Sequence, residues 1–137
     1  MFKKINRKNK KGFTLAELLI VVAIIGVLVA ISIPIFTSQL EKSREATDLA
    51  NLRSAYAEQM TALLTWDGTS DIDPIDVKAK QVQANWQTDG GKATTSLGNE
   101  DYGKVDAPCS TVGWKVKAVV DKTGKDEAKV EIEAKTA

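Results

Sequence analysis

A run of 23 residues without a charged side chain, residues 18–40, constrains this chain more than any other feature of its sequence. Its first part, residues 18–31, contains only Leu, Ile, Val, Ala and one Gly. As a helix the run measures ~34 Å, which is enough to cross the ~30 Å hydrocarbon core of a bilayer. Apolar side chains lie on every side of such a helix, and the rest of the chain is too small to bury it. The run therefore predicts a segment that is covered by lipid or by other helices.

The charges are distributed unevenly around this run. Residues 1–12 contain six Lys and Arg and no acid, whereas the remaining 125 residues contain 13 basic and 18 acidic side chains. Basic residues beside an apolar segment stay on the cytoplasmic side of a membrane, so the later residues are predicted to lie outside the cytoplasm. A nucleic-acid-binding protein would carry its basic residues on the folded surface. We therefore predict no nucleic-acid partner for the isolated chain.

The composition argues against an enzyme. The chain has no His, which removes the usual general base and the commonest metal ligand. It has one cysteine, Cys109, so no internal disulfide is available, and a small buried residue is a simpler interpretation than a bridge to another chain. Four aspartates within residues 67–76 lack the spacing of an EF-hand loop and are more simply loop-capping acids. We predict no catalytic residue, no cofactor and no metal site.

The helical pattern continues beyond the apolar run. Residues 37–65 contain neither Gly nor Pro, and their apolar side chains recur at intervals of three and four. These side chains are Leu49, Leu52, Tyr56, Met60 and Leu63. We predict one helix over 13–64, with Pro34 as a point where it can kink and with one face of its second half buried. The other faces carry charges, and the like-charged pair Glu41–Glu45 indicates that packing holds this half together.

Residues 66–137 predict a small head. Asp73-Pro74 followed by apolar residues at intervals of four, three and four predicts a short helix over 74–87, and residues 92–110 show no clear element. Alternating apolar residues predict two antiparallel strands, near 112–120 and 129–135. Their outward side chains place Lys115 and Lys117 across from Glu131 and Glu133. Trp86 and Trp114 are expected in the core, whereas Trp66 is the surface candidate.

The predicted fold class is therefore α+β. A long N-terminal helix, apolar in its first half and amphipathic in its second, packs against a small head with a short helix and an antiparallel sheet or hairpin. A bare hairpin is marginal in water, so the second half of the long helix is expected to complete the core of the head.

Residues 11–36 read KGFTLAELLIVVAIIGVLVAISIPIF. A basic leader ends at Gly12, Phe13 follows, and Glu17 is the fifth residue after that junction. Together with Gly26 and Pro34, these features closely resemble the type IV pilin and pseudopilin family over about residues 8–40. The resemblance implies that a membrane prepilin peptidase cuts between Gly12 and Phe13 and that the new amine of Phe13 is N-methylated. The apolar run then remains as a membrane anchor and later as the packing helix of a filament.

The resemblance also implies an organisation and a set of partners. Glu17, Gly26 and Pro34 take assembly roles, and the acid of Glu17 meets the N-terminal amine of a neighbouring subunit. The expected partners are the prepilin peptidase, identical or related pilin subunits in a homopolymer, and an inner-membrane assembly platform. The expected parts are a removed leader (1–12), the transmembrane and filament-core half of the helix (13–36), its amphipathic half (37–65) and the head (66–137). The precursor would lie in the bacterial cytoplasmic membrane, with its leader cytoplasmic and its head outside, and the assembled subunit in a cell-surface pilus.

The predicted function is that of a structural subunit of a type IV pilus. Adhesion, surface motility, biofilm formation and DNA uptake are family roles among which the sequence does not choose. The alternative within the family is the major pseudopilin of a secretion or competence apparatus. An alternative of another class is an exported or membrane-anchored binding module with an ordinary signal peptide cut after Ser32. Glu17 at the start of the run and Pro34, which would be the second residue after such a cut, argue against this last alternative.

Overall fold

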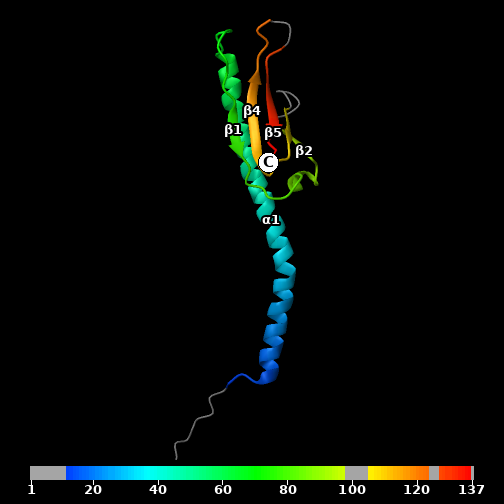
Figure 1. Ribbon diagram of the computed structural model, residues 1–137. Helices are drawn as coiled ribbons and strands as arrows, with labels where there is room; N and C mark the ends of the chain where they lie inside the picture. The colour runs from blue at the N-terminus through cyan, green and yellow to red at the C-terminus, as the bar shows by residue number, and fades with distance from the viewer. Residues whose placement is uncertain (1–11, 98–104, 124–126, 137) are drawn as a thin grey trace, which may run out of the picture. The chain divides into compact units, whose positions relative to one another are not determined.

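The computed structural model describes residues 12–97, 105–123 and 127–136 (Figure 1). The chain divides into two compact units, Met1–Thr37 and Ser38–Ala137, and one helix passes from the first unit into the second. In order, the elements are α1 (Leu15–Leu64), β1 (Ile75–Lys78), the 3₁₀ helix η1 (Gln87–Asp89), β2 (Thr94–Leu97), β3 (Val105–Pro108), β4 (Gly113–Val119) and β5 (Lys129–Ala134). The predicted α+β class, with a long N-terminal helix and C-terminal antiparallel strands, is confirmed.

Helix α1 agrees closely with the helix predicted over 13–64 and begins at Leu15. Its second half contains no Gly or Pro, so no residue there disfavours the helix strongly. Pro34 lies inside the helix, which continues beyond it. Because Pro34 has no N–H, it removes one backbone hydrogen bond, yet its carbonyl oxygen accepts a bond from the Thr37 hydroxyl at 3.0 Å.

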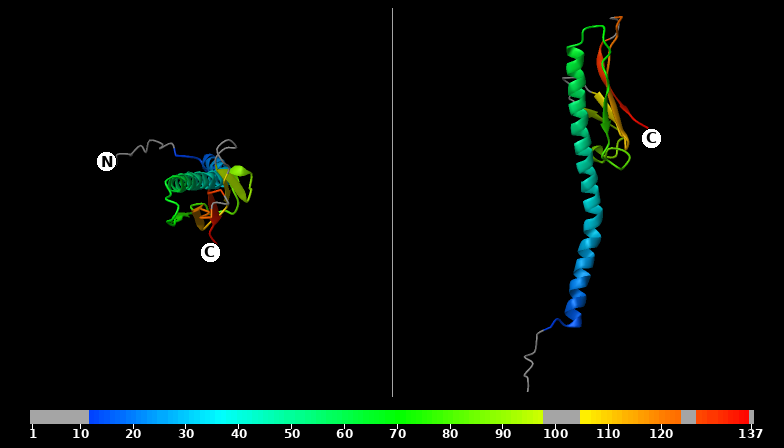
Figure 2. Two further views of the ribbon diagram at one scale, coloured as in Figure 1. Left: turned by 90° about the horizontal axis from the view of Figure 1, so that it is seen from above. Right: turned by 60° about the vertical axis from the view of Figure 1, so that its left-hand side comes forward.

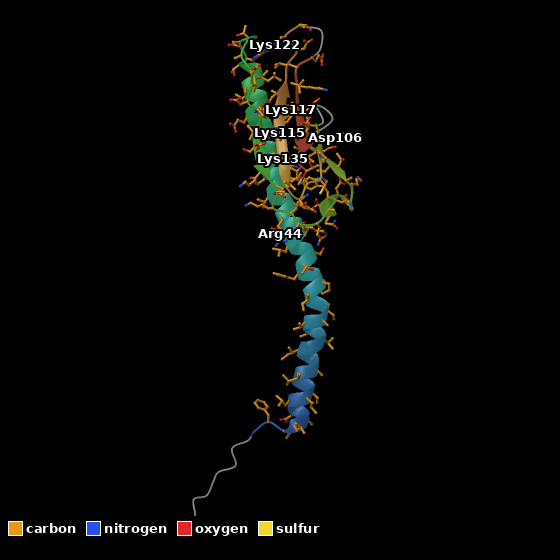
Figure 3. The ribbon with its side chains drawn as sticks, viewed as in Figure 1. Arg44, Asp106, Lys115, Lys117, Lys122 and Lys135 are labelled. Atoms are coloured by element: carbon orange, nitrogen blue, oxygen red, sulfur yellow. The ribbon has the colours of Figure 1, made fainter. Side chains whose placement is uncertain are left out.

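The second unit contains two antiparallel sheets. Strands β1, β4 and β5 form a sheet in that order, and β2 and β3 form a separate pair. The predicted strands near 112–120 and 129–135 are confirmed as β4 and β5. Lys115 lies opposite Glu133 and Lys117 opposite Glu131, as predicted. Both lysines lie on β4 (Figure 3), and the Lys117 amine contacts the Glu133 carboxylate at 2.5 Å. Such half-exposed ion pairs contribute little to stability.

The core of the second unit lies between α1 and the sheets. Leu52 and Ala55 of α1 are buried against the strands, and the β1–β4–β5 sheet runs along this half of α1 (Figure 2). Trp86 and Trp114 are both fully buried and stack with ring centroids 5.9 Å apart, as the sequence predicted for the core. The predicted apolar stripe also packs here, because Leu49, Tyr56, Met60 and Leu63 line the cluster. The amphipathic half of the helix therefore completes the core of the head.

The short helix predicted over 74–87 is wrong. Residues 75–78 form strand β1, which pairs with β4 through Ile75–Val116 and Val77–Trp114, and only Gln87–Asp89 is helical. The intervals between the apolar residues are those of a helix. The backbone N–H and C=O groups of β1 instead form hydrogen bonds with strand β4, which is distant in the sequence. Residues 92–110, for which no element was predicted, contain β2 and β3. Both strands are four residues long and have few buried side chains, so their alternation is too weak to recognise in the sequence.

Three carboxylates of α1 hold the segment 80–88 through its backbone. Glu41, Glu45 and Asp48 are 1%, 0% and 0% exposed, respectively. Each accepts hydrogen bonds from two consecutive backbone N–H groups. Asp48 accepts from Lys80 (2.8 Å) and Gln81 (2.9 Å), Glu41 from Val82 and Gln83 (both 2.8 Å), and Glu45 from Gln87 (2.6 Å) and Thr88 (2.8 Å). We call these three residues the carboxylate clamp.

The clamp corrects the sequence-based picture of a helix with one apolar face and charged outer faces. Bonds from N–H groups to carboxylates are stronger than bonds between neutral groups, and here they compensate the loss of hydration of the acids. Cations add a smaller contribution, since Arg44 contacts Glu41 at 3.3 Å and the charge of Lys80 favours the ionised form of Asp48. The like-charged Glu41 and Glu45 are therefore stabilised mainly by backbone dipoles.

Burial raises the pKa of the Asp48 carboxyl, although hydrogen bonds from the Gln81 and Lys80 backbones oppose the shift. A raised pKa means that the folded state binds a proton more readily than the unfolded chain does. The contribution of Asp48 to stability is therefore full at low pH and is lost as the pH rises through its folded pKa. At neutral pH the bonds from the Lys80 and Gln81 N–H groups favour the charged form of this carboxylate but offset the cost of its burial only in part.

The other singled-out side chains have separate local partners. Asp67 accepts N–H bonds from Thr69 and Ser70, Asp71 pairs with Lys122, and Asp76 pairs with Lys135. In the described parts of the chain no group of three or more His, Cys, Asp or Glu side chains is arranged so that it could hold a metal ion. Trp66 is half-buried and donates to the carbonyl of Ser70, and Cys109 is a free, half-buried thiol whose pKa is raised by burial.

We expect Gly113→Ala to lower the free energy of unfolding of the second unit by ~2–3 kcal/mol. Gly113 has a φ of +149°, and a Cβ atom there would lie 2.3 Å from the carbonyl oxygen of Val77 on strand β1. Thermal and urea unfolding of the two variants would measure the loss. Gly90→Ala is the matched control, because Gly90 also has a positive φ but its Cβ would meet no atom within 4 Å. Equal losses for the two variants would contradict the steric explanation.

Candidate processing and assembly site

The residues around the Gly12–Phe13 junction lie directly before the helix. Gly12, Phe13 and Thr14 have no regular secondary structure and are exposed, and the Phe13 side chain is 87% exposed. The first backbone hydrogen bond of α1 runs from the N–H of Leu18 to the carbonyl of Thr14 at 3.1 Å. The peptide bond between Gly12 and Phe13 is therefore outside the helix in this structure.

Thr14 and Glu17 form a reciprocal cap on the start of α1. The hydroxyl oxygen of Thr14 accepts the N–H of Glu17 at 3.2 Å, and the Glu17 Oε2 atom accepts the N–H of Thr14 at 3.1 Å. This arrangement is a capping box, which satisfies two backbone donors that a helix start would otherwise leave without partners. The acid also lies where the helix dipole favours negative charge.

The carboxylate of Glu17 retains acceptor capacity. Its Oε1 atom has no hydrogen-bond partner within the part of the chain that the structure describes, and the side chain is exposed. An ionised carboxylate has about four acceptor positions, so one bond to Thr14 leaves room for a cationic donor from outside the chain. The site can therefore bind an ammonium group without giving up its cap.

The apolar run forms the part of α1 that follows this cap. Its large side chains between residues 18 and 36 are between 47% and 68% exposed, so no face of this stretch is covered within the chain. By length and composition α1 can cross a membrane. Burying such side chains fully contributes ~1.5–3 kcal/mol each, so the stretch has a large driving force to enter lipid or pack against other helices.

The N-terminal part of the chain is similar to known proteins. A family described as "Prokaryotic N-terminal methylation motif" matches residues 7–33. The type IV major pilin protein PilA of Myxococcus xanthus is 43% identical over 69 residues, which are 50% of this chain and 31% of that protein. The type IV major fimbrial protein FimA of Dichelobacter nodosus is 34% identical over 98 residues, 69% of this chain and 49% of that protein.

The chain belongs to the type IV pilin and pseudopilin family. A third relative, the type IV narrow pilus major component PilA5 of Thermus thermophilus, is 50% identical over 50 residues, 34% of this chain and 43% of that protein. The chain spans between about a third and a half of the length of these curated relatives. No solved structure matches the chain. The relatives are named as pilins and fimbrial proteins and not as enzymes, in agreement with the prediction from composition.

Gly26 has no role within the chain that the structure reveals. A Cβ atom at this position would meet nothing within 4 Å, and glycine in a helix interior costs ~1 kcal/mol relative to alanine. The assembly roles that the pilin family suggests for Gly26 and Pro34 would therefore depend on other chains. They remain predictions, as do the roles of Gly12, Phe13 and Glu17.

The cap residue Thr14 lies in the segment that resembles pilins, but it is not among the residues predicted to act in processing or assembly. The signal was present, because Thr-x-x-Glu before an apolar run is the sequence signature of a capping box. Its hydroxyl, together with Glu17, caps the start of α1. The Gly12–Phe13 bond lies directly before this capped start.

Proposed function

We propose that the chain is a structural subunit of a type IV pilus, made as a membrane precursor, processed between Gly12 and Phe13, and polymerised through the N-terminal half of α1. The observation that carries the proposal is the solvent-exposed apolar stretch that begins directly after an acid of the helix cap, Glu17, and a Gly12–Phe13 junction that lies outside the helix. The relatives named as major pilins and fimbrial proteins support it.

Processing would proceed in two steps. In the first, a prepilin peptidase hydrolyses the Gly12–Phe13 bond, so that water supplies a hydroxyl to the Gly12 carbonyl carbon and a hydrogen to the Phe13 nitrogen. In the second, a methyl donor transfers a methyl group to the Phe13 amine, which loses a proton in exchange. The matching N-terminal methylation motif supports both steps at this position. The basic residues before Gly12 would hold the junction at the cytoplasmic face.

Assembly would then exchange one apolar environment for another. In the precursor, lipid covers the stretch 18–36 and the head lies outside the cytoplasm. An inner-membrane assembly platform would transfer the helix from lipid into a filament, where helices of identical or related subunits cover the same side chains. Lipid and packed helices are similarly apolar, so close packing and the pairing of polar groups must favour the filament. Glu17 is the acid available for such pairing.

Imaging would test the proposal most directly. Long surface fibres that bind an antibody raised against residues 66–137, and that disappear when the gene is deleted, are the expected result. Short or absent fibres, combined with lost secretion or DNA uptake on deletion, would instead establish the pseudopilin alternative. A mature chain beginning at Ile33 would favour the exported binding module, whereas the proposal requires a mature chain that begins at Phe13 and carries one additional methyl group.

We expect Gly12→Val and Gly12→Glu to block maturation. Gly12 has no side chain, so an extended backbone can approach the peptidase closely, and a branched or charged side chain would collide there. The precursor should accumulate in the membrane fraction with its leader attached, which immunoblotting and mass spectrometry of that fraction would show. Mature protein of normal mass and amount from either variant would contradict the prediction.

A further inference from the structure

We propose that Thr14 is a positioning residue for processing. Its hydroxyl, together with Glu17, fixes the start of α1 at Leu15 and so keeps the Gly12–Phe13 bond outside the helix, where a peptidase has access to it. This inference rests on the proposed processing at that bond. It adds a role for a residue that neither contacts the scissile bond nor takes part in the apolar packing.

The two bonds of the cap use the N–H groups that would otherwise extend the helix. In a longer helix the Glu17 N–H would donate to the carbonyl of Phe13, four residues earlier. In the structure this N–H donates to the Thr14 hydroxyl at 3.2 Å. The N–H of Thr14, which would donate still further back, is bound by Glu17 Oε2 at 3.1 Å. The cap therefore competes directly with a helix that includes Phe13.

The conformation of the junction matters for hydrolysis. Water or its activated equivalent must reach the Gly12 carbonyl carbon, and the Phe13 nitrogen must accept a hydrogen as the C–N bond breaks. Inside a helix the Gly12 carbonyl oxygen would accept the N–H of Ala16, and the surrounding turn would shield its carbon. An extended backbone instead exposes both atoms and can pair with an enzyme's own backbone groups.

The membrane increases the tendency of the helix to extend. The start of α1 precedes a stretch that we place in lipid, and N–H groups without partners are costly in an environment with little water. Without the cap, these donors would gain partners by drawing the carbonyls of residues 12 and 13 into the helix. The low helix propensity of Gly12 opposes this extension. Gly12 alone disfavours a helical junction only weakly, and the Thr14 cap disfavours it further.

Loss of the Thr14 side chain and loss of the Glu17 side chain should affect the cap differently. Thr14→Val keeps the shape of the side chain but removes the acceptor for the Glu17 N–H. Glu17→Ala leaves that acceptor in place and frees only the N–H of Thr14, which is exposed to solvent. Glu17→Gln retains an oxygen that can accept the same bond. Cleavage should therefore depend on residue 14 more than on residue 17.

The test measures cleavage kinetics of the full-length precursor in detergent with a purified prepilin peptidase. We expect Thr14→Val to raise KM by roughly two- to fivefold with kcat unchanged, because only the extended fraction of the precursor binds. Thr14→Ser and Thr14→Asn, which are good N-caps, should restore the wild-type KM. In parallel, the ¹³Cα chemical shift of Phe13 should move toward its helical value in Thr14→Val alone.

The order of the variants decides between capping and recognition of shape. If the peptidase recognises the shape of residue 14, the isosteric Val would be cut like wild type, whereas Ser and Asn would be cut slowly. That order, or a Phe13 shift unchanged by Thr14→Val, would overturn the inference. Failure of the wild-type chain to be cut at Gly12–Phe13 is read separately by mass spectrometry, and it would overturn the proposed processing itself.

Discussion

Glu17→Ala and Glu17→Gln should abolish or severely reduce filament formation while cleavage at Gly12–Phe13 remains largely intact. Sheared-fibre yield, measured together with the membrane level of mature subunit, would show the loss. A carboxylate within a membrane or a helix bundle costs ~2.5–3.5 kcal/mol near the helix centre, and less toward its end, unless it has a partner. No Lys or Arg lies between Phe13 and Leu40 to serve as that partner.

The cation that processing would create is the new amine of Phe13. Methylation leaves this amine able to carry a proton, so it can pair with the Glu17 carboxylate of a neighbouring subunit and set the axial register of the incoming helix. The free Oε1 atom of Glu17 is available for that bond, because the cap uses Oε2. Leaving either charge unpaired in an apolar filament core would be strongly unfavourable.

Glu17→Gln is the informative variant of the two, because it keeps the helix cap and removes the charge. If the acid served only the cap and the helix dipole, which is worth ~0.3–1 kcal/mol, Gln would support normal fibres. Glu58→Gln, an exposed acid of the second unit, controls for a general effect of losing one negative charge. Wild-type fibre yield from Glu17→Gln would contradict the pairing with the neighbouring amine and would show that the acid acts only on the cap and the helix dipole.

Glu45→Gln should lower the free energy of unfolding of the second unit by ~2–3 kcal/mol, and Glu45→Ala by ~3–5 kcal/mol. Both oxygens of Glu45 are used, one by the N–H of Gln87 and the other by the N–H of Thr88. A Gln side chain would place an NH₂ group against one of these donors. Urea unfolding of the purified chain, followed by tryptophan fluorescence of the buried Trp86–Trp114 pair, would measure the change.

Glu41→Gln is the matched control, because it makes the same chemical change one helical turn away. A single oxygen of Glu41, Oε1, accepts both of its backbone bonds, and the other oxygen contacts Arg44. Arg44 is about one-third exposed and can turn to water, so Gln at position 41 can keep its backbone bonds. We expect a loss of at most ~1 kcal/mol. Equal losses for the Glu41 and Glu45 variants would show that the charge, and not the acceptor geometry, stabilises the segment 80–88.

Several structural features of this protein could be predicted from local properties of its sequence. The long helix could be predicted because its apolar run, its stripe of apolar residues and the absence of Gly and Pro over 37–65 are all local and periodic. Strands β4 and β5 and the positions of Lys115 and Lys117 followed from strict alternation. The resemblance around Gly12, Phe13 and Glu17 followed from a short motif of fixed spacing, which the family match supports.

The remaining features depended on contacts between distant residues. Whether residues 75–78 form a helix or a strand is decided by the neighbouring β4, to which Val77 and its neighbours pair. A sequence pattern classes Glu41, Glu45 and Asp48 as surface charges, because it carries no information on donors more than 30 residues away. Only the folded chain brings the N–H groups of 80–88 onto α1, and there bonds from these groups offset part of the cost of removing three acids from water.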